Sequence, residues 1–154
     1  MSAPDLSLAI RSQEAIAAYL KSRQRFAGVT ILARRRGIIQ NDIDAAVGEM
    51  GAILYVLPGK PVKVNPNNPG PHAEQYEIRV RAIENPALNE TQPTAYELYE
   101  GALIELSHLT ITGLEVLGMI YPAEQNGDET PDPERIIIDA IFYANAQLPP
   151  RPGL

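Results

Sequence analysis

Proline sets the strictest limits on how this chain can fold. The 154 residues include 14 prolines, about twice the average share. A proline lacks a backbone donor, so it is excluded from the interior of helices and from central strands. Five of the prolines fall within residues 58–73. This stretch is therefore predicted to be a long loop, or a long hairpin with an irregular tip, and loops of that length are commonly functional or disordered.

Hydrophobic periodicity between the prolines predicts three helices and five strands. Apolar residues recur at helical spacing over 6–20, 41–50 and 94–109. Apolar runs and strict alternation predict strands at 29–32, 52–57, 76–83, 115–121 and 135–144. In the strand 76–83, the side chains of Glu77, Arg79 and Arg81 share one face. The order of these elements predicts an α+β fold, with a mainly antiparallel sheet of four to five strands and helices packed on one face.

Length and residue usage restrict the class of protein. A chain of this size forms one domain, which we expect over residues 1–148, followed by an extended proline-rich arm at 149–154. Cysteine is absent, so disulfides, thiolate metal sites and cysteine nucleophiles are excluded. The longest apolar stretch, at 52–57, is far too short to cross a membrane, and no secretory signal is expected at the amino terminus.

Charge is distributed unevenly along the chain. The net charge of −6 argues against a dedicated nucleic-acid-binding protein. Residues 1–40 carry seven lysines and arginines and two acids, a net +5, whereas residues 41–154 carry six and seventeen, a net −11. Copies of such a chain could contact each other head to tail. Alternatively, the two halves neutralise each other within one fold.

Residues suited to catalysis or metal binding are sparse. Neither His72 nor His108 has an acidic neighbour at ligand spacing, and no nucleotide-binding or hydrolase motif occurs. The acidic loop 124–134 is predicted to be a solvated turn, with a divalent-cation site as the alternative. Asp139 interrupts an apolar strand, so it either pairs with an arginine across the sheet or marks a solvent-facing row. No cofactor is predicted.

Two features suggest contacts with other proteins. Arg34, Arg35 and Arg36 follow a predicted strand. Adjacent arginines can anchor an acidic partner or contact phosphate, and a solvated loop is the third interpretation. Ile104 falls on the polar side of the third predicted helix, so it is a candidate contact only if the protein assembles.

The layout as a whole resembles a known family. A first helix and strand are followed by the strands Ala52-Ile-Leu-Tyr-Val-Leu57 and Tyr76-Glu-Ile-Arg-Val-Arg-Ala-Ile-Glu-Asn-Pro86. A helix containing Ala95-Tyr-Glu-Leu-Tyr-Glu-Gly-Ala-Leu-Ile-Glu-Leu106 and two closing strands complete the pattern. Over about residues 6–148 this pattern is similar to the tail terminator (tail completion) proteins of long-tailed bacteriophages and phage-tail-like particles.

The resemblance implies a structural virion protein without enzymatic activity, made in the host cytoplasm. Six copies would form a ring that caps the tail tube, ends its polymerisation and meets the head–tail connector or neck protein. The sheath protein would be a further partner in a contractile tail, DNA would only pass through the lumen, and no membrane is involved. The residues expected at protein interfaces are Arg34, Arg35, Arg36, Ile104, Asp128, Glu129, Asp132, Glu134, Pro66, Asn67 and Asn68.

Two other functions compete with this one. One is a neck or connector adaptor, or another oligomeric protein-binding module without catalytic activity. The other is a small α+β enzyme that uses carboxylates and a divalent ion.

Overall fold

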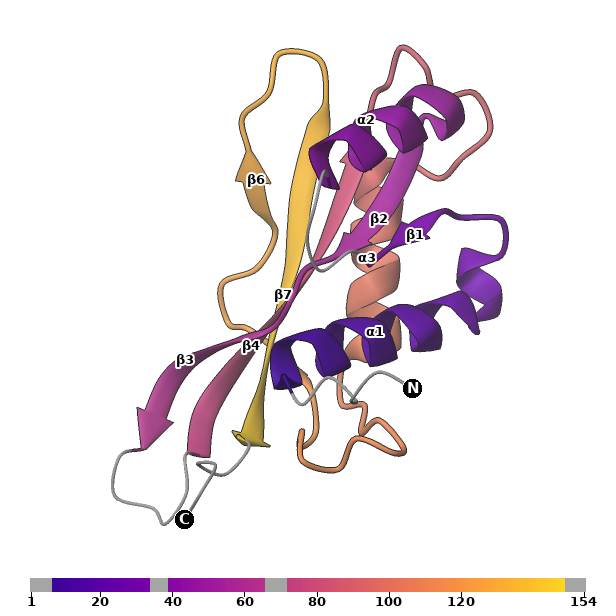
Figure 1. The fold of residues 1–154 in the computed structure, drawn as a ribbon. Helices are drawn as coiled ribbons and strands as arrows, with labels where there is room; N and C mark the ends of the chain where they lie inside the picture. Colours follow the sequence, from indigo (N-terminus) through magenta and orange to yellow (C-terminus); the bar gives the residue numbers. More distant parts are fainter. Residues whose placement is uncertain (1–6, 34–38, 66–71, 149–154) are drawn as a thin grey trace.

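The computed structural model describes residues 7–33, 39–65 and 72–148 (Figure 1). Within these ranges the chain forms three α-helices, one short 3₁₀ helix and seven strands. In chain order they are α1 (Leu8–Lys21), η1 (Gln24–Phe26), β1 (Ile31–Leu32), α2 (Ile39–Met50), β2 (Ala52–Val56), β3 (Lys60–Asn65), β4 (His72–Glu84), α3 (Ala95–Leu106), β5 (Tyr121–Pro122), β6 (Asp128–Thr130) and β7 (Ile136–Gln147).

Two long strands, β4 and β7, form the centre of the sheet and pair antiparallel over nearly their whole lengths. On the outer side of β4, the strands β2 and β3 pair with successive halves of it, and β1 adds to β2 in parallel. On the outer side of β7, β5 and β6 pair with separate segments. The β3–β4 hairpin and the end of β7 extend past the helices (Figure 1). Because β3 pairs with the outer side of β4 and β6 with the outer side of β7, these two strands lie on opposite edges of one sheet.

The larger core lies between one face of the sheet and the helices α1 and α3. Apolar residues at helical spacing on each helix, such as Ile16 and Leu20 on α1 or Leu98 and Ala102 on α3, are buried against it. The sheet supplies alternate residues of β2, β4 and β7, with Phe142 fully buried. This pattern is the expected one for amphipathic helices on a strand face.

A smaller core lies on the opposite face, beneath α2. Ile43 and Val47 of that helix pack against Ile53, Tyr55 and Ile83. The α+β class and the mainly antiparallel sheet are confirmed, but the expectation that every helix packs on one face is wrong for α2. The reason is that β2 is buried at all five positions, and a strand that is apolar on both faces needs cover on both.

The proline-rich stretch forms a hairpin. Lys60–Asn65 makes the exposed strand β3, which pairs with β4 with irregular register, so the hairpin interpretation is confirmed up to residue 65. Residues 66–71 lie outside the described part of the chain, as do 149–154, the predicted carboxyl-terminal arm. With β3 and the short β6, the sheet has seven strands, more than the four to five predicted.

Two further predicted segments, 115–121 and the end of the third helix, need correction. The segment 115–121 does not form one continuous strand: Leu117 and Ile120 make isolated bridges to two different partners, Ala146 and Leu109, and Gly118 donates its N–H to the carbonyl of Asn145. Only Tyr121–Pro122 pairs as β5. The third helix ends at Leu106 rather than near residue 109, while its capping box at Thr94 and Glu97 is confirmed.

Candidate functional site

A network of charged side chains lies on the same face of the sheet as α2, on the part of that face that α2 does not cover. Its centre is Asp139 of β7, which is 1% exposed. Its carboxylate accepts hydrogen bonds from Arg79 Nη1 at 2.8 Å and from Arg81 Nε at 2.8 Å. The sequence left two interpretations of Asp139 open, and pairing with arginine across the sheet is the one the structure confirms.

Arg79 links this buried carboxylate to the surface. Its Nε donates to Glu77 Oε1 at 3.0 Å, and its Nη1 lies 3.4 Å from Asp128 Oδ2. Burial alone would lower the pKa of Arg79, but the hydrogen bonds to Asp139 and Glu77 outweigh it and raise the pKa above its ordinary value. The hydrogen bond to Asp139 likewise raises the pKa of Arg81. Both guanidinium groups therefore stay charged at every accessible pH.

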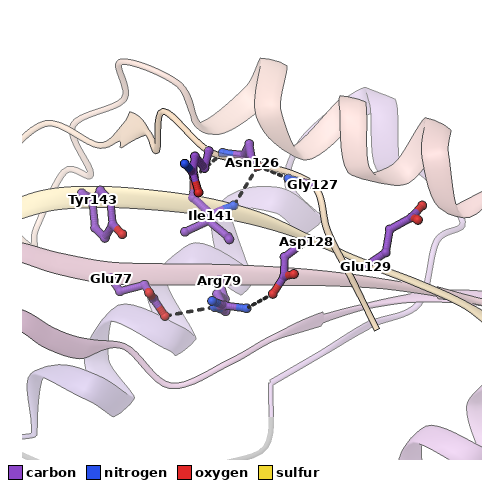
Figure 2. A pocket seen from close by; sticks show the side chains of 9 residues that line it. Glu77, Arg79, Asn126, Gly127, Asp128, Glu129, Ile141 and Tyr143 are labelled. Atoms are coloured by element: carbon purple, nitrogen blue, oxygen red, sulfur yellow. Dashed lines mark hydrogen bonds and ion pairs between the residues drawn. The ribbon is translucent and has the colours of Figure 1, made fainter. Parts of the chain in front are cut away.

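An open hollow of about 650 Å³ lies over this network (Figure 2). The residues that line it are Glu77, Arg79, Gln125, Asn126, Gly127, Asp128, Glu129, Ile141 and Tyr143. One of its walls is fixed by Asn126, whose side chain donates to the carbonyl of Ile141 at 2.7 Å and accepts from the Ile141 N–H at 3.1 Å. Three carboxylates at this hollow, against one guanidinium, favour contact with a positively charged group.

The predicted acidic residues divide between β6 and the turn after it. Asp128 and Glu129 are exposed on β6, and Glu129 accepts a hydrogen bond from the Tyr96 hydroxyl at 2.8 Å, which raises the pKa of Tyr96. Asp132 accepts the backbone N–H groups of residues 134 and 135, and these bonds lower its pKa. Asp132 therefore shapes the turn, while Glu134 is exposed.

In the described ranges, no three histidine or carboxylate side chains are placed to hold a metal ion. The carboxylates Asp128, Glu129 and Asp132 instead have the arginine, tyrosine and backbone partners already given. None of the helices in these ranges has the length and apolar character of a membrane span.

The remaining predicted interface residues fall into two groups. Ile104 is 61% exposed on α3, as predicted; its part in a contact stays a prediction. Six residues lie outside the described part of the chain: Arg34, Arg35, Arg36, Pro66, Asn67 and Asn68.

Sequence reasoning missed the exposed edge formed by β3. Lys60 and Lys63 keep 67% and 66% of their side chains exposed, and Val62 and Val64 are 48% and 46% exposed. The signal was the polar–apolar mixture within residues 60–65, which the density of prolines obscured.

Comparison with known proteins identifies a structural likeness. No protein-family model and no curated protein sequence matches the chain. Among solved structures, a chain described as "Virion of native gene transfer agent (GTA) particle" superposes with a TM-score of 0.60 and 15% sequence identity. The match covers 92% of this chain and 99% of that chain. The two chains therefore share a fold along almost their whole lengths.

Proposed function

We propose that this protein is a structural component of a phage-like virion. In this proposal six copies form a ring at the end of the tail tube, end its polymerisation and join it to the head–tail connector. The partners are the chain itself, the tail tube protein and the connector or neck protein, with the sheath protein added if the tail is contractile. DNA passes through the lumen without binding.

The observation that carries the proposal is the fold shared with a chain of a gene transfer agent virion. The superposition spans 92% of this chain and 99% of the other, so no extra domain on either side accounts for it. The strands and the helix on which the resemblance to tail terminators rests, at 52–57, 76–86 and 95–106, correspond to β2, β4 and α3 of this fold. Because the shared fold assigns no position within the virion, a neck or connector adaptor is the second candidate.

The charged network is suited to stabilising the fold of each copy rather than to catalysis. Asp139 is the most buried carboxylate in the described ranges, and two guanidinium groups neutralise it. A general acid or base needs a titratable group that reaches its substrate, whereas this carboxylate is held between β4 and β7. Its contribution is to hold the sheet together.

Native mass spectrometry with negative-stain imaging, over a range of protein concentrations, tests the ring. Six copies of the 16.8 kDa chain give a particle of about 100 kDa with six-fold symmetry. A stable dimer at every concentration would contradict the ring and favour a protein-binding module.

Mixing the protein with purified tail tubes separates the two virion roles. A terminator binds tube ends and stops further growth, while a neck adaptor binds the connector and leaves tube growth unchanged. Replacing Arg34, Arg35 and Arg36 with Glu is expected to weaken ring formation, because it reverses three charges predicted to lie at a protein interface. Unchanged assembly would remove these arginines from the interface.

A further inference from the structure

The two outer edges of the sheet carry opposite charge. Two of the six residues in β3 are lysines and none is acidic, whereas two of the three residues in β6 are acidic and none is basic. Since β3 pairs with the outer side of β4 and β6 with the outer side of β7, these segments face away from each other. They therefore cannot neutralise one another within one copy.

The β3 edge is open to a partner. It pairs with β4 on one side, and five of its six residues are exposed. Lys60 and Lys63 approach acids of β4, at 3.8 Å from Glu77 and 3.1 Å from Glu74, yet keep two-thirds of their side chains in solvent. Val62 and Val64 add apolar surface that a contact would remove from water.

The β6 edge is its counterpart. All three of its residues are exposed, and 64% of the Asp128 side chain is open to solvent despite its contact with Arg79. Pairing with β7 uses one side of this strand and leaves the other side open. Asp128 contacts Arg79 and Glu129 accepts from the Tyr96 hydroxyl, but both residues remain exposed to a neighbour.

We propose that the basic β3 edge of one copy binds the acidic β6 edge of the next copy, head to tail. This inference rests on the proposed ring and names the contact within it. A heterologous contact between two different surfaces closes into a ring when the rotation per copy is right. A β3 edge repels another β3 edge and a β6 edge repels another β6 edge, so charge selects the one pairing that can continue around a ring.

Pro61 limits the form of the contact. A proline has no backbone N–H, and prolines and lysines on an edge strand discourage uncontrolled strand addition. Main-chain pairing is therefore restricted to the part of β3 that follows Pro61, and lysine–carboxylate pairs provide the selectivity.

Charge reversal tests the pairing. One variant carries Lys60→Glu and Lys63→Glu, and a second carries Asp128→Lys and Glu129→Lys. Each is expected to assemble at least about tenfold more weakly than the unmodified chain, because like charges then face each other. An equimolar mixture of the two variants is expected to recover assembly, since each then presents an edge opposite in charge to one edge of the other.

The control variant is Glu49→Lys with Glu90→Lys, which reverses two exposed acids away from both edges. Circular dichroism and thermal melting of every variant separate loss of contact from loss of fold. If both edge variants assemble as well as the control variant, the pairing is wrong.

Cysteine cross-linking locates the contact, because the chain has no cysteine of its own. Val62→Cys and Thr130→Cys in one chain are expected to give a ladder of disulfide-linked oligomers, while each single-cysteine chain stays unlinked. Disulfides between Val62→Cys chains alone would overturn the inference.

The proposed function and the pairing fail in different ways. Rings of six that ignore both charge reversals and give no cross-links leave the ring proposal intact and overturn the pairing. A chain that neither forms rings nor binds tube ends overturns both.

Discussion

The carboxylate of Asp139 lies directly opposite Arg81 on the neighbouring strand and binds it with both oxygens. Oδ1 lies 2.8 Å from Arg81 Nε, and Oδ2 lies 3.0 Å from Nη2. Arg79, two residues earlier on β4, adds a third hydrogen bond at 2.8 Å. A one-residue slip between β4 and β7 would move this carboxylate to the other face, so the pair also fixes the register of the two central strands.

Replacing Asp139 with Asn is expected to destabilise the fold by about 2–3 kcal/mol. The substitution keeps the shape but leaves two guanidinium groups without their buried counter-charge. Fully buried pairs cost more to break, but Arg79 and Arg81 keep 26% and 30% of their side chains exposed and so retain contact with water. Urea unfolding measures the difference, and Asp128→Asn, at the exposed end of the same network, is the control with an expected change under about 0.5 kcal/mol.

The sequence offered pairing with an arginine as one of two interpretations of Asp139, and alternation placed Arg79 and Arg81 on one face. It could not predict which arginine lies opposite, because that depends on the register of strands more than fifty residues apart. The short strand β6 was beyond prediction for a related reason. Its three residues carry no periodicity and pair only because β7 provides an edge for them.

The position of α2 shows a second limit. The apolar run at 52–57 correctly predicted a strand, and the periodicity of residues 41–50 correctly predicted a helix. No feature of the local sequence indicates which face of the sheet that helix covers. The choice follows from the alternate residues Ile53 and Tyr55, which point away from the α1 and α3 side and need cover of their own.

Replacing Gly51 with Ala is expected to destabilise the fold by about 3 kcal/mol or more. Gly51 has φ +89°, and an added Cβ would lie 2.5 Å from the Cα of Asn89. The cost combines left-handed backbone strain of about 1–2 kcal/mol with a clash against backbone that must move.

Gly113→Ala is the matched control for Gly51, because its φ of +88° is nearly the same and nothing lies within 4 Å of the added Cβ. Its expected cost is the strain alone, about 1–2 kcal/mol. Thermal unfolding of both variants checks this, and equal losses would show that the contact with Asn89 relaxes freely.

Acid is expected to weaken the contact between α2 and the start of β7. Arg135 Nη1 lies 2.8 Å from Asp44 Oδ1, and this hydrogen bond, with a smaller one from Gln40, lowers the pKa of Asp44. A carboxylate whose pKa is lower in the folded state stabilises the fold above its unfolded pKa of about 3.9, and this stabilisation is lost as the pH falls through the folded value.

Asp44→Asn is therefore expected to reduce the slope of stability against pH below about pH 4. Its destabilisation, small for an exposed pair, is fully present at pH 7 and disappears as the pH falls through the folded pKa. Urea unfolding at a series of pH values, compared with Glu49→Gln at an exposed position of the same helix, measures the slope. If the two variants have the same acid dependence, the Asp44–Arg135 pair is not its source.

Ile104 offers a test of assembly that is separate from charge. It is 61% exposed on α3, a helix that packs against the sheet through its buried face. Ile104→Ser is expected to leave the unfolding free energy of the isolated chain within about 0.5 kcal/mol, since the side chain has little left to lose on the surface. Burying its exposed part at a contact contributes about 1–2 kcal/mol, so the same change is expected to weaken each contact in a ring about 5–30-fold.

The control variant is Leu88→Ser, which removes an apolar side chain that is 49% exposed and lies outside the predicted interface. Sedimentation over a concentration series compares the assembly of the two variants. Only a contact that buries Ile104 makes the loss of its side chain differ from the loss of another exposed apolar side chain such as Leu88. If the two serine variants assemble equally well, Ile104 therefore has no role in assembly.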